Sequence, residues 1–312
     1  MTEFDVLVIG GVGVDTIIRV PDLTIPPGDN LPVPPIVDYV AHSGNGVALG
    51  FHALGLRTKF VDFLGDDQQG ELIRRRYDGV GLDFASLPAP NGTPRSVNLV
   101  DTAGRRFSFY DGRHPAGLTL PREFYLPLLE RTRHAHIGGR DMAAFADARR
   151  LGVTTSCDIH AWDGVAQWAL DCASQADIVF LSSAAAPEKI DDLMRTILDA
   201  GVAELVVATE GDAGCRVLTR AEGQVRRFPT VEPERPVVDS NGAGDAFSTA
   251  FMSRWFAGRP VEECALAGAV SGAFACGAHG THEELISAER LAQAVERAGQ
   301  TPRWRDGRPD TA

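Results

Sequence analysis

The stretch that decides the fold is VVDSNGAGDAFSTAF, residues 237–251. Its apolar run stops at Asp239, a run of small residues follows, and a helical pattern begins near Asp245 and runs to Gly258. Glycine just past a periodic segment, with Pro260 beyond it, is typical of a helix end. The order of these signals predicts a strand, a tight glycine turn and a helix.

The turn itself predicts an anion-binding site. Its small residues are Gly242, Ala243 and Gly244. Their backbone N–H groups would be unpaired donors at the positive end of the helix dipole, and no bulky side chain would keep an anion away. Asp245 lies in the same turn and could accept a proton from a hydroxyl while the amides stabilise a transferred phosphoryl group. A carboxylate that only stabilises the helix dipole is the alternative interpretation.

The rest of the chain alternates between strand and helix. Apolar runs of strand length cover 5–11, 59–65, 135–139, 155–159, 177–181 and 204–209. Helical periodicity covers 66–77, 141–151, 163–175 and 187–200. Such alternation predicts an α/β fold with a mostly parallel central sheet that helices flank on both faces. The segments 14–40 and 95–113 break this rhythm, contain strand-like runs, and predict a small β-sheet lid.

Composition limits the classes of function. The 312 residues, of which 44% are hydrophobic, suffice for one large domain, residues 1–300, followed by a polar tail, 301–312. The net charge of -12 disfavours nucleic acid and anionic membranes as partners. No apolar run is long enough to span a membrane, no secretory signal opens the sequence, and the five cysteines lack C-x-x-C spacing. We therefore expect a cytoplasmic enzyme that acts on small molecules.

Two common nucleotide-binding motifs are missing. The chain has two lysines, Lys59 and Lys189, and neither follows a glycine, so the G-x-x-x-x-G-K-[ST] loop cannot be written. A dinucleotide fingerprint that starts at Gly11 would need glycine where the chain has Thr16. An NAD-dependent oxidoreductase is therefore disfavoured, and ATP would have to be bound by another motif.

The run DSNGAGDAF, residues 239–247, resembles the C-terminal signature D-T-x-G-A-G-D of the ribokinase-like (PfkB) carbohydrate and nucleoside kinases. This resemblance implies a ribokinase-like α/β fold and phosphoryl transfer from ATP to a hydroxyl, with Asp245 as the general base. The anion hole would be formed by Gly242, Ala243 and Gly244. Asp239 would lie near the metal, or near a monovalent cation in relatives that use one.

Two stretches near the N-terminus resemble the part of the family that binds the acceptor. Asp15 occupies the aspartate of the opening G-x-x-x-x-D, which binds sugar hydroxyls, and a carboxylate can accept both hydroxyls of a vicinal diol. The run SGNGVALGFHALG, 43–55, resembles the family's first signature and implies acceptor contacts from Gly44 and Asn45. Ser43 replaces the usual first glycine, so this match is partial.

Two further stretches match in the middle of the chain. The run VVATEGDAGCRVL, 206–218, resembles the nucleotide loop T-x-G-x-x-G, with a plain strand-to-hairpin turn as the alternative. The residues beside ATP would be Thr209, Gly211 and Gly214. The run FLGDDQQGELI, 63–73, matches a structural G-x-D-x-x-G motif, and Asp66 is its candidate helix N-cap.

One departure concerns the metal. Where the family usually writes N-x-x-E, whose residues support the magnesium and phosphate network, the chain reads Ser182-Ser183-Ala184-Ala185. The loss need not abolish catalysis, because Mg²⁺ keeps several waters and binds substrate phosphates. It raises the alternative of a non-catalytic sugar or nucleotide sensor, which the retained Asp245 disfavours.

The resemblance thus implies ATP- and Mg²⁺-dependent phosphorylation of a sugar or sugar derivative, in particular of its hydroxymethyl group. A nucleoside is the alternative acceptor within the family. An anionic acceptor is a further hypothesis, with a solvated strand face as the simpler interpretation. The arginines that suggest it are Arg95, Arg105, Arg106 and Arg113. Family members often form dimers through the lid, which implies that a homodimer is to be tested here.

Overall fold

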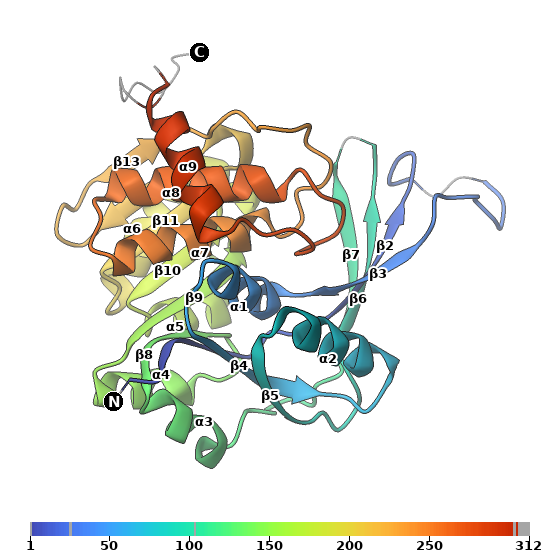
Figure 1. Cartoon of the computed structure of the whole chain (residues 1–312), viewed down its shortest axis with the longest axis horizontal. Helices are drawn as coiled ribbons and strands as arrows, with labels where there is room; N and C mark the ends of the chain where they lie inside the picture. The colour runs from blue at the N-terminus through green and yellow to red at the C-terminus, as the bar shows by residue number, and fades with distance from the viewer. Residues whose placement is uncertain (1, 25–26, 103, 302–303, 305–312) are drawn as a thin grey trace.

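The computed structural model describes residues 2–24, 27–102, 104–301 and 304. Within this part of the chain, a nine-stranded sheet runs through the molecule in the order β13-β12-β11-β10-β9-β8-β1-β4-β5 (Figure 1). Its strands are β1 (Phe4–Ile9), β4 (Thr58–Leu64), β5 (Asp83–Pro88), β8 (Thr132–Ile137), β9 (Thr154–Ala161), β10 (Ile178–Ser182), β11 (Leu205–Thr209), β12 (Cys215–Thr219) and β13 (Val225–Phe228). The strands from β11 to β5 are parallel, whereas β12 and β13 run antiparallel to their neighbours.

Helices cover this sheet on both faces. They are α1 (Ser43–Ala53), α2 (Gln68–Val80), α3 (Arg122–Leu129), α4 (Ala143–Leu151), α5 (Gln167–Ala173), α6 (Ile190–Ala200), α7 (Ala243–Phe256), α8 (Val261–Ala275) and α9 (Ala288–Gly299), with short 3₁₀ turns η1 (Ser183–Ala185), η2 (Pro187–Lys189) and η3 (Gly211–Ala213). Strand β1, which lies between β8 and β4, is apolar on both sides as a result. Val6 and Val8 pack into a core with α1 and α7, whereas Leu7 and Ile9 pack into a second core with α3 and α4.

The mostly parallel sheet flanked by helices is the fold that the sequence predicts. Each of the six apolar runs overlaps a strand, and the four periodic segments overlap α2, α4, α5 and α6. One detail differs, because the N-cap of α2 is Asp67 and not Asp66. Asp67 has the extended conformation of an N-cap, and its carboxylate accepts a hydrogen bond from the N–H of Gly70 at 2.8 Å.

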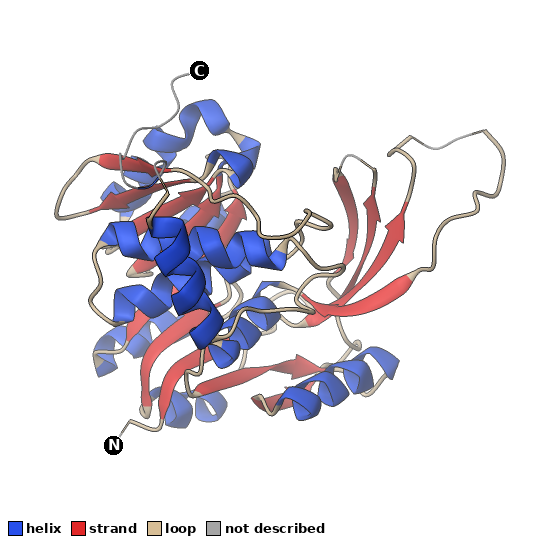
Figure 2. Cartoon of the chain, turned by 45° about the horizontal axis from the view of Figure 1, so that its top comes forward, coloured by secondary structure: helices blue, strands red, loops and turns tan. Residues whose placement is uncertain are grey.

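A second, smaller sheet stands beside the large one (Figure 2). Among the described residues it has four strands in the order β3-β2-β6-β7, namely β2 (Gly13–Arg19), β3 (Val37–Ala41), β6 (Arg95–Val100) and β7 (Arg106–Asp111). They lie in the two segments from which the sequence predicts a small sheet. β1 passes almost directly into β2, and β3 passes directly into α1. The junction of the two sheets therefore lies at the carboxyl end of β1.

Two predictions concern the ends of the chain and membranes. The polar tail, 301–312, lies outside the described residues apart from Thr301 and Trp304. In the part of the chain that is described, no helix has the length and apolar character needed to cross a membrane.

Candidate active site

The glycine turn of the signature opens helix α7, as the sequence predicts. Gly242 is the N-cap, with a φ of 77°, and a Cβ at this position would lie 1.9 Å from the carbonyl oxygen of Thr281. Backbone conformation and space both require glycine here. The segment before the turn is not a strand, contrary to the prediction. The N–H groups of Val238 and Asp239 both donate to the carbonyl of Cys276 after α8, and not to a neighbouring strand.

The backbone N–H groups at the start of α7 are largely free. Those of Gly242, Gly244 and Asp245 have no hydrogen-bond partner among the described residues. The N–H of Ala243, in contrast, donates to the carbonyl of Ser240 with an N···O distance of 3.3 Å. Gly244 is exposed, and a Cβ built on it would have no atom within 4 Å. A ligand can therefore approach three donors at the positive end of the helix.

The carboxylate of Asp245 belongs to a chain of buried polar groups. Its Oδ2 lies 2.8 Å from Nε2 of His282, which is 4% exposed. Nδ1 of His282 lies 2.9 Å from Nδ2 of Asn45, and Oδ1 of Asn45 accepts a hydrogen bond from the hydroxyl of Tyr77 at 2.8 Å. Burial raises the pKa of Tyr77 well above its usual range, so its hydroxyl remains a donor. The chain of contacts links α2, α1 and the segment after α8 to Asp245.

The first turn of α1 lies between Asp245, at the start of α7, and the carboxyl end of β1. Gly44 packs on the end of β1, where a Cβ would lie 1.9 Å from the carbonyl oxygen of Gly10. Gly46 packs on Asp245, where a Cβ would lie 2.6 Å from Oδ2. The side chain of Asn45 points inward, is fully buried and bonds to protein groups. Its contact with an acceptor, and that of Gly44, stay predictions.

Asp15 lies in β2 and forms the other half of the site. It accepts a hydrogen bond from Nδ2 of Asn98 at 2.7 Å, and both residues are buried. Oδ1 of Asp15 and Oδ1 of Asn98 are buried without a hydrogen-bond partner among the described residues. Burial alone would raise the pKa of Asp15, but contacts with His42, followed by Asn98 and Ser96, lower it below its usual value. An ionised carboxylate with a buried oxygen that lacks a hydrogen bond is suited to accept a hydroxyl from a ligand.

His42 is a site residue that sequence reasoning missed. It precedes α1 with a φ of 73°, which residues other than glycine rarely adopt. Its Nε2 lies 3.5 Å from Oδ1 of Asp15, and its ring lies 5.7 Å from that of the exposed Tyr110. The ring rests on Gly13, where a Cβ would lie 2.1 Å from it. An aromatic surface therefore borders Asp15.

The predicted nucleotide loop connects β11 to β12, which are antiparallel. Gly214 has a φ of 103°, its carbonyl accepts from the N–H of Glu210 at 2.8 Å, and a Cβ on it would lie 2.0 Å from the carbonyl oxygen of Phe228. Its backbone is thus that of a strand-to-hairpin turn, one of the two interpretations of the sequence. Thr209 and Gly211 lie at the carboxyl end of β11, the edge at which open α/β sheets bind ligands. Their contact with ATP stays a prediction.

Asp239 is tied to the small sheet. Its Oδ2 accepts a hydrogen bond from Arg19 at 2.6 Å, and its Oδ1 accepts from the backbone and the side chain of Asn241. Arg106 of β7 also contacts the side-chain oxygen of Asn241. The described residues contain no group of three or more His, Cys, Asp or Glu side chains that could hold a metal ion. A cation at Asp239 would have to displace Arg19, and this role stays a prediction.

The place of the missing N-x-x-E carboxylate is occupied by the short turn η1. Oγ of Ser182 accepts a hydrogen bond from the N–H of Ala184 at 3.3 Å, and the residue at the glutamate position is Ala185. Asp158, in the neighbouring strand β9, is a carboxylate on this side of the site. Burial raises its pKa, and the charge of Asp245 acts in the same direction.

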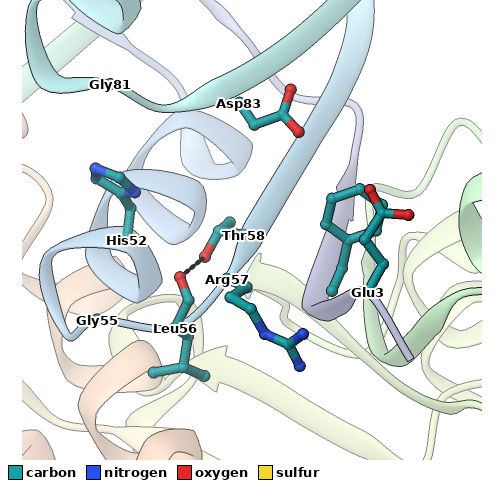
Figure 3. Close-up of a pocket in the computed structure, with 9 residues that line it drawn as sticks. Glu3, His52, Gly55, Leu56, Arg57, Thr58, Gly81 and Asp83 are labelled. Atoms are coloured by element: carbon teal, nitrogen blue, oxygen red, sulfur yellow. Dashed lines mark hydrogen bonds between the residues drawn. The ribbon is translucent and has the colours of Figure 1, made fainter. Parts of the chain in front are cut away.

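A separate pocket lies at the opposite edge of the large sheet (Figure 3). Phe4, Thr58 and Asp83 line it at the first residues of β1, β4 and β5, next to His52 and Arg57. Ligands of open α/β sheets bind at the carboxyl ends of the strands, whereas this pocket lies at the amino ends. We assign it no part in the reaction.

Comparison with known proteins identifies the class. The model of the pfkB family of carbohydrate kinases matches residues 4–288, and the chain belongs to this family. It is 46% identical over 281 residues, which are 87% of this chain and 92% of the relative, to acarbose 7(IV)-phosphotransferase of Actinoplanes sp.. The structure of a microbiome-derived acarbose kinase is 43% identical, with a TM-score of 0.87 over 95% of this chain and 100% of that one.

The fold is shared more widely. The ribokinase of Arabidopsis thaliana, whose structure was determined with ribose and ATP, superposes with a TM-score of 0.78 at 18% identity, over 95% of this chain and 99% of that one. The protein is therefore a carbohydrate kinase with a ribokinase-like fold, as the resemblance of residues 239–247 to the family signature implies.

Proposed function

We propose that this kinase transfers the γ-phosphoryl group of ATP to a hydroxyl of a sugar or sugar derivative, in particular to its hydroxymethyl group, with Asp245 as the general base. The observation that carries the proposal is the position of the first turn of α1. Gly46 packs against Asp245, while His42, at the other end of the turn, is in contact with Asp15. An acceptor whose hydroxyls bind Asp15 would therefore extend toward Asp245.

The chemistry follows from the groups at the start of α7. Asp245 accepts the proton of the acceptor hydroxyl, the freed oxygen forms a bond to the γ-phosphorus, and the bond between that phosphorus and ADP breaks. The free N–H groups of Gly242 and Gly244, with a weaker contribution from that of Ala243, stabilise the charge on the transferred group. Positioning and electrostatics supply the rate enhancement, without a covalent intermediate.

The acceptor side favours a neutral or cationic sugar derivative over an anionic one. The buried oxygens of Asp15 and Asn98 that lack a hydrogen bond need donors. Two arginines of the small sheet pair with carboxylates, Arg105 with Asp101 and Arg113 with Asp111. Arg106 contacts the side-chain oxygen of Asn241, so Arg95 alone of the four candidate arginines has no side-chain partner among the described residues. The relatives named for acarbose support acarbose, or a sugar derivative of the same kind, as the acceptor.

We expect ATP to bind beside Thr209, Gly211 and Gly214, at the carboxyl end of β11. Mg²⁺ would be held chiefly by the nucleotide phosphates, because the described residues form no metal-binding cluster. When bound, it neutralises charge on the phosphates. A monovalent cation near Asp239 remains a separate expectation.

The small sheet would act as a lid over the acceptor and exclude water, which limits ATP hydrolysis.

Strand β7 of the small sheet exposes Phe107 and Phe109, which a second copy of the chain could cover in a homodimer. The lid segments 14–40 and 95–113, the domain boundary at residue 300 and the cytoplasmic location stay predictions. Sedimentation at several protein concentrations, with Phe109→Ser as the comparison, would test the dimer.

A coupled ADP-release assay tests the proposed reaction. The acceptor panel should hold acarbose, neutral hexoses, an acidic sugar and nucleosides, and each should be assayed with the native chain and with Asp245→Asn. We expect turnover on acarbose or a related neutral or cationic sugar, and its loss in the variant. Binding of a sugar without ADP release across the panel would instead support a sensor, and turnover on nucleosides alone would replace the acceptor class.

A further inference from the structure

We propose that His282 is a positioning residue that holds the carboxylate of Asp245 in one orientation, with its imidazole fixed as the neutral Nε2–H tautomer. The inference rests on the proposed role of Asp245 as the general base. It concerns a residue outside every motif that the sequence analysis identified. The supporting geometry comes from the chain of contacts through Tyr77, Asn45 and His282 to Asp245.

The positions of the hydrogens on Asn45 and His282 follow from neighbouring groups that can act only as a donor or only as an acceptor. The hydroxyl of Tyr77 donates to Oδ1 of Asn45, and Nδ2 of Asn45 donates to the carbonyl oxygen of Val40 at 3.1 Å. These two contacts fix the orientation of the amide. The second hydrogen on Nδ2 therefore points to Nδ1 of His282, which must accept it and can carry no proton. The proton of a neutral imidazole is then on Nε2, which donates to Oδ2 of Asp245.

The surroundings leave His282 little freedom to move. A Cβ on Gly46 would lie 2.3 Å from its Nε2, and a Cβ on Gly242 would lie 2.7 Å from its Cδ2. Its backbone carbonyl accepts a hydrogen bond from Arg76 of α2 at 3.0 Å. The hydroxyl of the preceding residue, Thr281, donates to the carbonyl of Val40 at 3.0 Å. Gly46 and Gly242 thus make room for this ring.

The consequence is an asymmetric carboxylate. Oδ2 of Asp245 accepts the N–H of a neutral donor, so Oδ1 is the oxygen left for the acceptor hydroxyl. The neutral imidazole adds no positive charge beside the base. Because a displacement of about 1 Å can cost about 100-fold in rate, loss of this contact should lower kcat much more than it weakens binding.

Three variants test the inference by steady-state kinetics on the full chain. His282→Leu removes the donor, and we expect kcat to fall about 100-fold while KM for ATP and for the acceptor changes less than about threefold. His282→Gln can accept from Asn45 and donate to Asp245, and it should keep kcat within about tenfold of the native value. The matched control, His279→Gln, changes an exposed histidine nearby and should leave both constants unchanged.

The double variant separates this inference from the proposed function. If His282 acts through Asp245, adding His282→Leu to Asp245→Asn should change the remaining single-turnover rate less than about twofold. Native turnover in Asp245→Asn would contradict the role of the base itself. Loss of turnover in Asp245→Asn, with equal and native-like kinetics in His282→Leu and His282→Gln, would overturn only the role of His282.

A measurement on the native chain keeps the inference testable even where His282→Leu fails to fold. Nitrogen-15 NMR of the imidazole groups, assigned with His282→Gln, reports which ring nitrogen carries hydrogen. We expect His282 to show a protonated Nε2 and a bare Nδ1, as the contact with Asn45 requires. A proton on Nδ1 of His282 in the native chain would overturn the assignment.

Discussion

The start of α7 and the proposed acceptor side on the small sheet differ in how their buried polar groups form hydrogen bonds. At α7 the side chains of Asp245, His282 and Asn45 bond to one another and to the protein. At the small sheet, Asp15 and Asn98 each keep a buried oxygen without a hydrogen bond among the described residues, although His42 lies 3.5 Å from that of Asp15. The first arrangement is complete before a ligand arrives, whereas the second needs donors from the ligand. Changes at α7 should therefore act on kcat, and changes at the small sheet on KM.

The largest expected effect is that of Asp245→Asn. An amide cannot accept the proton, so kcat should fall by about 10³- to 10⁴-fold, which is the upper part of the range for a general base. Titration calorimetry should find the acceptor and ATP bound with near-native affinity, because the contacts at Asp15 are unchanged. Weakened acceptor binding with kcat preserved at saturation would reverse the comparison.

Asp15→Asn tests the other side. Hydrogen bonds to a charged group contribute about 1.5–3 kcal/mol, so kcat/KM for the acceptor should fall about 10- to 100-fold, mainly through KM. Asp38→Asn is the matched control, because Asp38 is an exposed carboxylate on β3 of the same sheet that contacts Thr16. An equal effect of both variants would mean that net charge of the sheet, and not the site at Asp15, determines acceptor binding.

His134 and His136 on β8 are buried and have hydrogen-bond partners, and they extend the comparison to the stability of the fold. Burial, with a smaller contribution from His136, lowers the pKa of His134 to about 3, and its ring contacts the hydroxyls of Thr154 and Ser156. An unfolded histidine titrates near pH 6.5, so below that pH the unfolded state gains a proton that the folded state does not bind. Stability should therefore fall as the pH drops from 7 to 5.

Replacing His134 should weaken this pH dependence. In His134→Gln the loss of unfolding free energy between pH 7 and pH 5 should be smaller by about 1–2 kcal/mol, as measured by urea denaturation. The exposed His279→Gln serves as the control and should keep the native slope. An unchanged slope in His134→Gln would indicate that other groups cause the acid sensitivity.

The smallest expected effect comes from Gly13→Ala. The new Cβ would lie 2.1 Å from the ring of His42, so the ring must leave its place beside Asp15. We expect KM for the acceptor to rise about three- to tenfold, the range for loss of one polar contact, with kcat and the melting temperature near native. A change confined to kcat would mean that His42 acts on the chemical step.

Sequence reasoning was strong where one local rule determines the structure. The glycine turn, the helix after it and the apolar strands buried on both faces follow from glycine conformation and hydrophobic pattern. Strand β5 was missed because its residues are only partly buried, and the expected strand before Gly242 failed because its N–H groups bond to the end of α8 instead. The position of β5 at the edge of the sheet could not be predicted from an apolar run.

The candidate site shows the same limit. Asp15 and Asp245 were identified because each lies in a motif, whereas His42, Asn98 and His282 gained no signal from their neighbours in sequence. His282 is 237 residues from Asn45 and 37 from Asp245, and only the fold brings the three together. A single histidine in a sequence is usually a structural residue, and its role becomes visible when both ring nitrogens have partners.

The most direct measurement is a crystal structure of the chain with a non-hydrolysable ATP analogue and acarbose or the best acceptor from the panel. The account predicts an acceptor hydroxyl within about 3 Å of Oδ1 of Asp245 and the terminal phosphate at the N–H groups of Gly242 and Gly244. It also predicts acceptor hydroxyls on Asp15 and Asn98. A terminal phosphate remote from the start of α7, or an acceptor whose hydroxyls all lie away from Asp245, would contradict it.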